Sequence, residues 1–493
     1  MAGIILSVGT NVISWVTTLA QLKFHLSQEI QEMSQPNILF IMTDQQRWDA
    51  LGCVSDWVKT PSLDRIAAEG VRFANCVTNS PVCIPARVSL ATGRYPHNTG
   101  VWKNLEYDMP ADTPTWMQAV QDAGYRTSLF GKTHLHHHKG DLRDREHLLH
   151  AYGLQDVDEI GGPRASSWVL SHMTAKWADA GLLDAYREDY HERFSNKPHV
   201  VRPSALPFEQ YADVYVGQQA KAYLQGYNRE EPWFCWVSFG GPHEPWDAPE
   251  PYASMYDPAI MPEPVMPTDA SRLVEVDGVL DWKLQSSKSI SREEIAACRA
   301  NYAGNVTLID DQIGEILQVL EERGELENTI ILFSSDHGEL NGDYGLIYKE
   351  TFLNGAVRVP LLVRTPATMH SSVAGSVAKT PVEWFDIGPT LVELAGGTLS
   401  HVQFARSLCP VLEDPEAAVR DFAVSEYDGE IMYMDQRWKL FISGEGKPYR
   451  LFDLEADPNE TANLIADPAT SVLQAELRIR IQEHLVRTQV RAG

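Results

Sequence analysis

Short apolar runs that end in polar residues recur along this chain. They cover residues 37–43, 71–77, 125–130, 232–239, 328–335 and 359–364. Runs of this kind are typical of strands buried on both faces of a parallel sheet. The segments between them at 60–70, 113–124 and 291–324 have helical character and end in glycine. This alternation predicts an α/β fold in which helices sandwich a large, mixed and mostly parallel sheet.

The pattern changes beyond about Pro410. Segments 422–426, 430–434 and 438–442 are short and alternating, which predicts an antiparallel sheet. At 493 residues the chain also exceeds what one hydrophobic core usually holds. We therefore expect an extension of unassigned role at 1–35, a main α/β domain at 36–410, and a smaller C-terminal domain of antiparallel sheet plus helix at 411–493.

The first twenty residues are apolar but lack the marks of a targeting segment. They carry no basic stretch, and residues 21–35 contain no small-residue cleavage site. Asn11, Ser14 and a pair of threonines interrupt the apolar run, which argues against a membrane span. We expect no signal peptide and, as the default, a cytoplasmic location.

Charge and cysteine content narrow the functional classes. The formal net charge of -26 repels polyanions at long range, so we expect no nucleic-acid partner and no membrane binding through a basic patch. Any anion site must therefore be local. The six cysteines lack metal-ligand spacing or a dense disulfide pattern, which argues against a zinc site or a disulfide scaffold.

Two of the predicted strands end in pairs of polar side chains. Asp44 and Gln45 follow the first run, and Asp336 and His337 follow the run at 328–335. Sites in open α/β sheets gather at the carboxyl ends of strands, where oxygen-bearing side chains suit a hard cation. For the first pair, a strand-end turn is the alternative explanation.

A lone thiol lies just ahead of a helical segment at residues 83–93. Arg87 follows Cys83 by one helical turn, and the amides at the start of that helix lie nearby. Together they form an electropositive pocket suited to an oxygen anion or an activated nucleophile. The alternative is a buried structural cysteine at a turn.

Other loops carry candidate cations and proton donors. After the run at 125–130, Lys132 and His134 stand at alternate positions and can approach one anionic group. His243 lies in a loop stiffened by proline and glycine, which suits a fixed general acid. Lys349 is by default a surface charge, and Asn104 by default a turn residue.

Several polar residues are interpreted without a role in chemistry. We expect His136, His137 and His138 to be solvated loop residues, because consecutive side chains point in different directions. Asp310 and Asp311 are expected to lie on a polar helix face rather than to bind metal. Residues 141–225 are charged, aromatic and irregular, and an insertion of this kind often shapes a binding site.

The residues at 83–93 resemble the signature of the type I sulfatases of the alkaline phosphatase superfamily. That signature is Cys-x-Pro-x-Arg followed by Leu-x-Thr-Gly, and Cys83, Pro85, Arg87, Leu90, Thr92 and Gly93 match every fixed position. Gly131-Lys-x-His134, Pro242-His-x-Pro245, the two strand-end pairs and Lys349 are similar to the family's companion motifs. Residues 380–397 resemble a family helix, and residues 451–464 resemble its C-terminal turn before the last helix.

The resemblance implies a modified nucleophile and a metal. In that family a formylglycine-generating or equivalent maturation enzyme converts the cysteine, here Cys83, to formylglycine, whose hydrate attacks sulfur. One divalent metal, Ca²⁺ or alternatively Mn²⁺, would be bound by Asp44, Gln45, Asp336, His337 and residue 83. The catalytic set would be Cys83, Arg87, Lys132, His134, His243 and Lys349, with Asn104 and Thr133 binding the substrate.

The implied roles differ among these residues. Arg87 and the metal would stabilise the nucleophilic oxygen, and His243 and Lys349 would assist departure of the alcohol. His134 would take the proton whose loss expels sulfate. Thr133 stands where many members of the family have tryptophan.

The expected function is hydrolysis of a small-molecule or saccharide sulfate ester, as in an arylsulfatase. The main alternative is a phosphonate monoester or phosphodiester hydrolase on the same fold, because Gln45 and Asn104 suit it. Lys132 and His134 stand against that alternative. A non-catalytic anion-binding relative is a third reading, and the sequence is compatible with a homo-oligomer.

Overall fold

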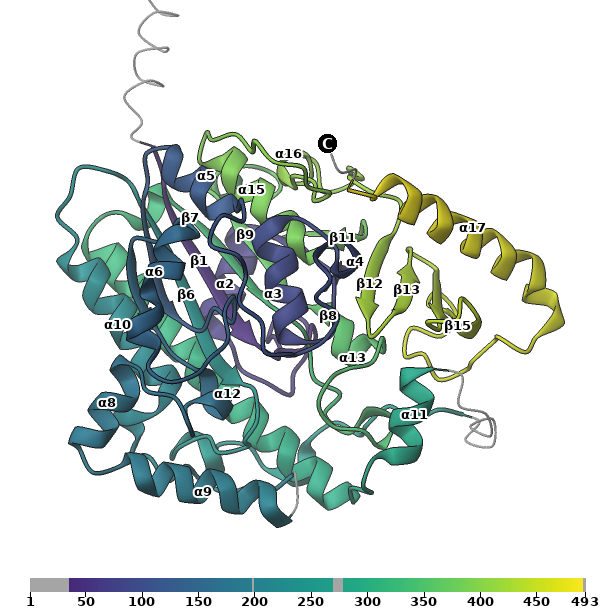
Figure 1. The fold of residues 1–493 in the computed structure, drawn as a ribbon, viewed down its shortest axis with the longest axis horizontal. Coiled ribbons are helices and arrows are strands. Elements are labelled where there is room, and N and C mark those ends of the chain that lie inside the picture. The colour runs from purple at the N-terminus through teal and green to yellow at the C-terminus, as the bar shows by residue number, and fades with distance from the viewer. Residues whose placement is uncertain (1–34, 197–198, 269–277, 491–493) are drawn as a thin grey trace, which may run out of the picture.

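The computed structural model describes residues 35–196, 199–268 and 278–490. Its centre is an eight-stranded sheet in the order β10-β2-β9-β7-β1-β6-β4-β5 (Figure 1). The strands are β1 (Asn37–Asp44), β2 (Val71–Phe73), β4 (Arg126–Gly131), β5 (Asp156–Glu159), β6 (Trp233–Pro242), β7 (Thr329–Ser335), β9 (Leu361–Arg364) and β10 (Ser376–Ala378). β1 pairs in parallel with β6 and β7, and β9 is antiparallel to both its neighbours. The predicted large, mixed and mostly parallel sheet is confirmed.

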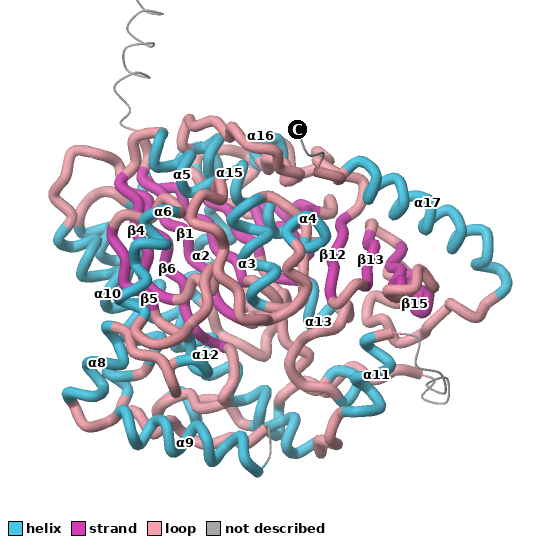
Figure 2. The backbone as a smooth tube through the Cα atoms, viewed as in Figure 1, coloured by secondary structure: helices cyan, strands magenta, loops and turns pink. Residues whose placement is uncertain are grey.

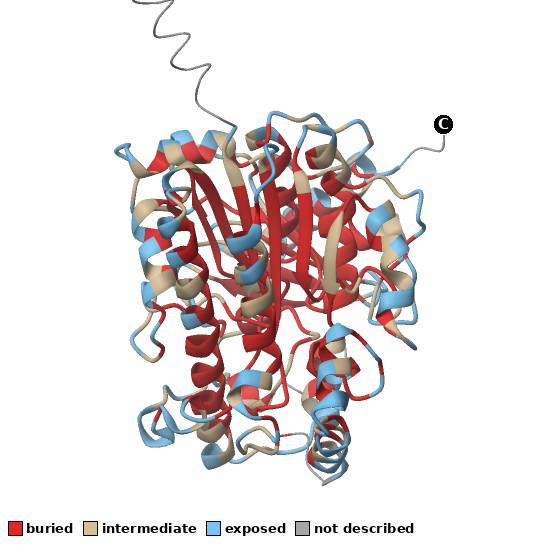
Figure 3. Cartoon of the chain, turned by 90° about the vertical axis from the view of Figure 1, so that its left-hand side faces the viewer, coloured by how far each residue is buried: buried red, intermediate tan, exposed pale blue. Residues whose placement is uncertain are grey.

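Helices cover both faces of this sheet, as expected. Successive residues of β1 point to opposite faces, so Ile38 and Phe40 pack against α3, α5 and α15, whereas Leu39 and Ile41 pack with α2, α10 and α12. Figure 3 shows the buried strands between helices whose outer sides are exposed. The longer helices are α2 (Pro61–Glu69), α3 (Cys83–Thr92), α5 (Trp116–Asp122), α8 (His172–Asp179), α9 (Leu183–Asn196), α10 (Ala212–Gly226), α11 (Val279–Ser286), α12 (Arg292–Glu322), α15 (Ile387–Leu394) and α17 (Ser471–Arg487). Shorter ones are α4 (Pro96–Thr99), α6 (Glu146–Ala151), α7 (Gly162–Ala165), α13 (Asn354–Val357), α14 (Pro366–Met369) and α16 (Cys409–Glu413).

The expectation of an irregular segment at 141–225 is wrong. This segment contains α6 to α10 and the edge strand β5. β5 reads Asp-Val-Asp-Glu and lacks an apolar run because it pairs with β4 alone. In α9, packing depends on aromatic contacts such as Tyr186 against Trp177, 4.7 Å between ring centroids, rather than on an aliphatic stripe.

The run at 71–77 forms two strands rather than one. β2 belongs to the large sheet, whereas β3 (Cys76–Val77) lies in a small three-stranded sheet between β11 (Val382–Glu383) and β8 (Arg358–Val359). The chain therefore leaves the main sheet before it reaches Cys83.

The C-terminal part contains the expected antiparallel sheet and last helix (Figure 2). β12 (Ala423–Tyr427), β13 (Glu430–Met434), β14 (Trp438–Ile442) and β15 (Pro448–Asp453) pair in that order. α17 buries Leu477 and Ile481 against this sheet. The turn expected at 451–464 begins later, because residues 451–453 belong to β15. The domain boundary at 410 stays a prediction.

The expectations for the N-terminus fall on residues outside the described part of the chain. They concern the extension at 1–35, of which only residue 35 is described, and the cytoplasmic location drawn from it. Among the described helices, none is both long and apolar enough to cross a bilayer.

Asp310 does not lie on an exposed polar face. Its carboxylate is buried and accepts hydrogen bonds from the backbone amides of Ser62 and Leu63 at 2.9 and 2.8 Å. It thereby satisfies two free N–H groups at the start of α2. Burial raises the pKa of Asp310 to about 7. Asp311 is exposed, as expected.

Gly131 allows β4 to end in close contact with β6. Its φ is +117°, and a Cβ atom there would lie 1.8 Å from the carbonyl oxygen of Ser238. The next residue, Lys132, donates its backbone N–H to that same oxygen at 2.9 Å. The glycine therefore fixes the direction in which the chain leaves the sheet.

Replacing Gly131 by alanine should destabilise the protein severely, by about 3 kcal/mol or more, because strain at a special φ and a backbone clash add together. Gly124→Ala is the matched control, since Gly124 has φ +96° and no atom within 4 Å of its Cβ position. The control should cost only ~1–2 kcal/mol. Denaturant unfolding of both variants measures the difference, and equal losses would refute the argument.

Candidate active site

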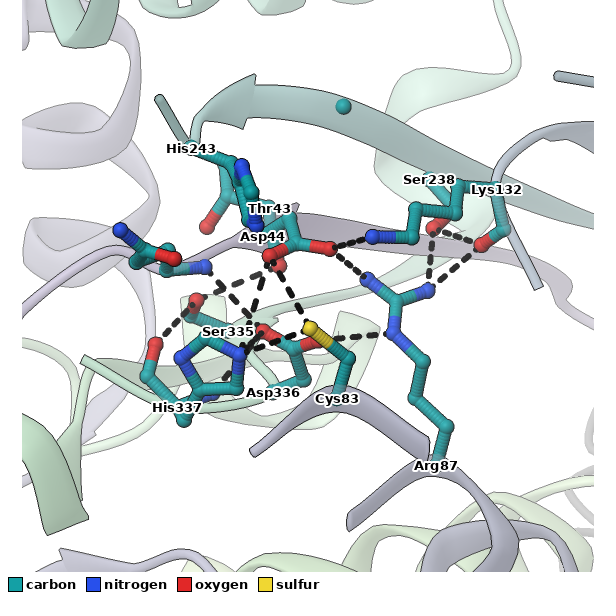
Figure 4. A network of polar contacts seen from close by, with 12 residues as sticks. Thr43, Asp44, Cys83, Arg87, Lys132, Ser238, His243, Ser335, Asp336 and His337 are labelled. Atoms are coloured by element: carbon teal, nitrogen blue, oxygen red, sulfur yellow. Dashed lines mark hydrogen bonds and ion pairs between the residues drawn. The ribbon is translucent and has the colours of Figure 1, made fainter. Parts of the chain in front are cut away.

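Four side chains converge at the carboxyl ends of β1 and β7 (Figure 4). Asp44 ends β1, Asp336 and His337 follow β7, and Cys83 is the first residue of α3. Because β1 and β7 are parallel neighbours, both strand ends reach the same edge of the sheet. The sulfur of Cys83 lies 3.1 Å from Nε2 of His337 and 3.8 Å from Oδ1 of Asp44. All four residues are buried.

Two cations hold the outer oxygens of these carboxylates. Arg87 donates from Nη2 to Oδ2 of Asp44 at 3.0 Å and from Nε to Oδ2 of Asp336 at 2.7 Å. Lys132 donates from Nζ to Oδ2 of Asp44 at 2.5 Å. Burial and Cys83 raise the pKa of Asp44, but Lys132, His243 and Arg87 outweigh them and hold it well below its usual value. The Asp44 carboxylate is therefore charged at neutral pH.

The donor set fits a divalent cation. Nδ1 of His337 lies 3.0 Å from the carbonyl oxygen of Gly338, which sets the tautomer and leaves Nε2 free to face the carboxylates. That nitrogen lies 3.8 Å from Oδ1 of Asp44 and 3.7 Å from Oδ1 of Asp336. Two carboxylate oxygens and an imidazole nitrogen thus point at one place with their other atoms engaged. Calcium and manganese both remain compatible with these ligands.

Cys83 lies in the electropositive environment that the sequence predicted. Burial raises the pKa of its thiol, but Lys349, Lys132 and His337 together leave it well below the usual value. The backbone N–H of Ile84 donates to Oδ1 of Asn104 at 2.9 Å, which holds Asn104 at the start of α3 beside Cys83.

Gln45 bridges a lysine to two carboxylates that sequence analysis missed. Its Oε1 accepts a hydrogen bond from Lys349, and its Nε2 donates to Glu244 at 2.8 Å and to Glu339. Both glutamates are buried. Their positions, directly after His243 and two residues after His337, were the available signal. As a metal ligand, Gln45 stays a prediction.

His243 and Arg87 each have a distinct setting. His243 is buried, with Nδ1 2.8 Å from the carbonyl oxygen of Glu244, and its ring lies beside Asp44 in Figure 4. Arg87 is completely buried, and its third nitrogen, Nη1, donates to the carbonyl oxygen of Lys132 at 2.6 Å. All its nitrogens are therefore engaged within the protein.

Comparison with known proteins identifies the family. The sulfatase family profile matches residues 36–397, and the profile "N-sulphoglucosamine sulphohydrolase, C-terminal" matches residues 342–487. The chain belongs to the sulfatase family. It is therefore a hydrolase of the class that cleaves sulfuric esters.

Individual relatives span several activities. The chain is 29% identical to an arylsulfatase of Clostridium perfringens over 87% of its own length and 90% of that protein. It is 30% identical to a choline-sulfatase of Rhizobium meliloti, covering 90% and 85%. Among solved structures, the phosphonate monoester hydrolase of Agrobacterium radiobacter has a TM-score of 0.74 and 27% identity, covering 92% of this chain and 95% of that one.

Two of the three histidines after His134 in this sulfatase are not solvated, contrary to expectation. His136 and His138 are buried, and their Nε2 atoms lie 2.7 and 3.3 Å from the carboxylate of Glu159. The hydroxyl of Thr133 also donates to Glu159, so this hydroxyl is engaged away from a substrate. The ring of His138 stacks on that of His134 at 4.7 Å between centroids.

Glu159 therefore anchors the loop that carries His134. The residue lies at the end of β5, which sequence analysis missed because that strand has no apolar run. Burial raises the pKa of Glu159, but His136 and His138 outweigh it and hold it well below the usual value. Burial lowers the pKa of His136, but Glu159 outweighs it and leaves it raised.

Replacing Glu159 by glutamine should lower the free energy of unfolding more at low pH than at high pH. A raised pKa of His136 stabilises the fold fully below its unfolded value, and this contribution is lost as pH rises through the folded value. We expect a loss of about 1–3 kcal/mol near pH 5.5 and a smaller loss near pH 8.5. Denaturant unfolding at both pH values tests this, with the exposed Glu106→Gln as the control. A loss independent of pH would show that the His136–Glu159 pair is not ionic.

Proposed function

We propose that this sulfatase hydrolyses a small-molecule or saccharide sulfate monoester through formylglycine formed from Cys83 by a maturation enzyme. The observation that carries the proposal is the position of Cys83. It begins α3 with its sulfur against the Asp44, Asp336 and His337 cluster, and it is surrounded by Lys132 and Lys349. An oxygen nucleophile at this position would be next to a cation site and next to groups that can bind sulfate oxygens.

The chain's own residues divide the work of the proposed reaction. Asp44, Asp336 and His337 hold a divalent cation, with Gln45 as a further ligand candidate; the cation supplies positive charge to the nucleophilic oxygen and the sulfate group. Lys132 and Lys349 are placed to bind sulfate oxygens. Arg87 orients the two aspartates, because its nitrogens are already engaged with them.

Two histidines are proposed to handle protons. His243 gives a proton to the departing alcohol oxygen, since its ring is held by the backbone and lies beside Asp44. His134 takes a proton from the second hydroxyl of hydrated residue 83, which expels sulfate and restores the aldehyde. Burial and Lys132 lower the pKa of His134 to about 3, so its imidazole is neutral and free to accept that proton.

A phosphonate monoester hydrolase is the second candidate. The likeness to the Agrobacterium radiobacter enzyme favours it, together with Gln45 and with Asn104 beside Cys83. Lys132 favours a sulfate ester, because it adds a cation at the position where a sulfate oxygen would bind. The named relatives include a choline-sulfatase, an ulvan-active sulfatase and an N-acetylglucosamine-6-O-sulfatase, and these substrates define a first screen.

Turnover of an aryl sulfate and an aryl phosphonate in parallel tests the proposal. The protein should be produced with a formylglycine-generating enzyme, and mass spectrometry of the peptide containing residue 83 should establish the extent of conversion. We expect the sulfate to have the higher kcat/KM, with activity proportional to conversion. Preference for the phosphonate would support the second candidate, and full activity of unconverted thiol protein would refute the mechanism.

Substitutions of the two histidines should have different kinetic signatures. His243→Asn should reduce kcat for an alkyl sulfate by about 100-fold to 10,000-fold, because an alkoxide needs a proton to leave. The loss should be much smaller for a nitrophenyl sulfate. His134→Asn should instead give a burst of alcohol release followed by slow sulfate release.

Rapid-quench assays of alcohol and sulfate measure both effects, with the exposed His147→Asn as a control. Equal losses of the His243 variant on alkyl and nitrophenyl esters would show that His243 binds sulfate oxygens instead. Loss of the burst together with overall activity would remove the assigned role of His134.

A further inference from the structure

The four converging side chains have the spacing of a tetrahedral metal site that includes sulfur. Sulfur of Cys83 to Nε2 of His337 is 3.1 Å, and to Oδ1 of Asp44 it is 3.8 Å. From Nε2 of His337, Oδ1 of Asp44 is 3.8 Å away and Oδ1 of Asp336 is 3.7 Å away. Zinc bonds of about 2.0–2.3 Å in a tetrahedron require ligand separations of about 3.3–3.7 Å. The donor atoms thus need only small shifts to enclose a zinc ion.

The surroundings of these atoms are already arranged for metal binding. Nδ1 of His337 is engaged by the carbonyl oxygen of Gly338, which leaves Nε2 as the donor toward the metal. Arg87 and Lys132 occupy Oδ2 of Asp44, and Arg87 occupies Oδ2 of Asp336. Each aspartate therefore keeps Oδ1 facing the cysteine. Such outer partners orient ligands and raise affinity.

The chemistry of the donor set depends on the state of residue 83. A thiolate is a soft ligand that, with imidazole and carboxylate, favours zinc over calcium or manganese. Once residue 83 is an aldehyde hydrate, the same pocket offers oxygen and one nitrogen, which suit a harder cation. The identity of the metal is thus linked to the modification.

We propose that the unconverted protein is a zinc-binding form, in which Cys83, His337, Asp44 and Asp336 hold one Zn²⁺, and that conversion of Cys83 switches this pocket to a hard cation. As the sulfur–zinc bond forms, the thiol proton is released to solvent and no redox change occurs. The inference rests on the cation centre of the proposed function, but it does not depend on which ester is cleaved.

Zinc bound in this way would keep the unconverted protein inactive. Four protein ligands complete a tetrahedron and leave no open position, which is typical of structural rather than catalytic zinc sites. The ion would also cover the sulfur. We therefore expect the folded, zinc-loaded thiol form to be resistant to modification at Cys83.

Cobalt is the direct probe of this site. Protein made without a maturation enzyme, confirmed as the Cys83 thiol by mass spectrometry and stripped with a chelator, is titrated with Co²⁺ and then with Zn²⁺. We expect a near-ultraviolet sulfur-to-cobalt charge-transfer band that saturates at about one ion per chain and is abolished by zinc. Converted protein should show no such band.

Two variants assign the sulfur. Cys83→Ser should abolish the band and weaken zinc binding at least ~100-fold, the upper end of the effect expected for loss of a merely supporting partner. Cys53→Ser is the matched control, because Cys53 is exposed and lies outside the site, and it should leave both unchanged. If Cys83→Ser fails to fold, the band in unmutated thiol protein still decides.

Cobalt bound stoichiometrically without a thiolate band would overturn the proposal. Equal affinities of the thiol form for zinc and calcium in competition assays would also overturn it. Failure of the converted protein to cleave sulfate esters would instead count against the proposed function alone, because none of these metal measurements uses turnover.

Discussion

The oxygen Oδ2 of Asp44 receives both Arg87 and Lys132 inside the protein, and this buried ionic contact determines how the rest of the site is arranged. Arg87 also binds Asp336, so one guanidinium connects the ends of two strands. Removing one partner of a buried pair typically costs about 3–5 kcal/mol, because the other charge is left without compensation. The aspartates are thereby fixed with their inner oxygens directed at Cys83.

An outer layer of hydrogen bonds supports the residues that would contact a substrate. Gln45 links Lys349 to Glu244 and Glu339, and Glu159 gathers Thr133, His136 and His138. The bonds of Glu159 hold the loop that carries His134 in place before any ligand arrives. Preorganisation of this kind is what makes electrostatic stabilisation effective in an enzyme, because little reorganisation is needed during the reaction.

The local charge of the site is opposite to that of the whole chain. The protein has a formal net charge of -26, yet Arg87, Lys132 and Lys349 lie close to residue 83. A sulfate ester therefore gains from short-range contacts with these groups and not from long-range attraction. This arrangement is consistent with selection among anions by geometry within the pocket.

The sequence by itself determined the main sheet, the antiparallel C-terminal sheet and the residues of the central site. Buried strands carry continuous apolar runs and the site motifs follow them directly, so local pattern was enough to find Asp44, Cys83, Asp336 and His337. The tertiary structure alone decided which charges pair. Glu159, Glu244 and Glu339 were missed, and His136 and His138 were placed in solvent, because burial of a polar residue depends on partners distant in sequence. Glu159 meets its histidines only when β5 joins the edge of β4, an event that no apolar run announces.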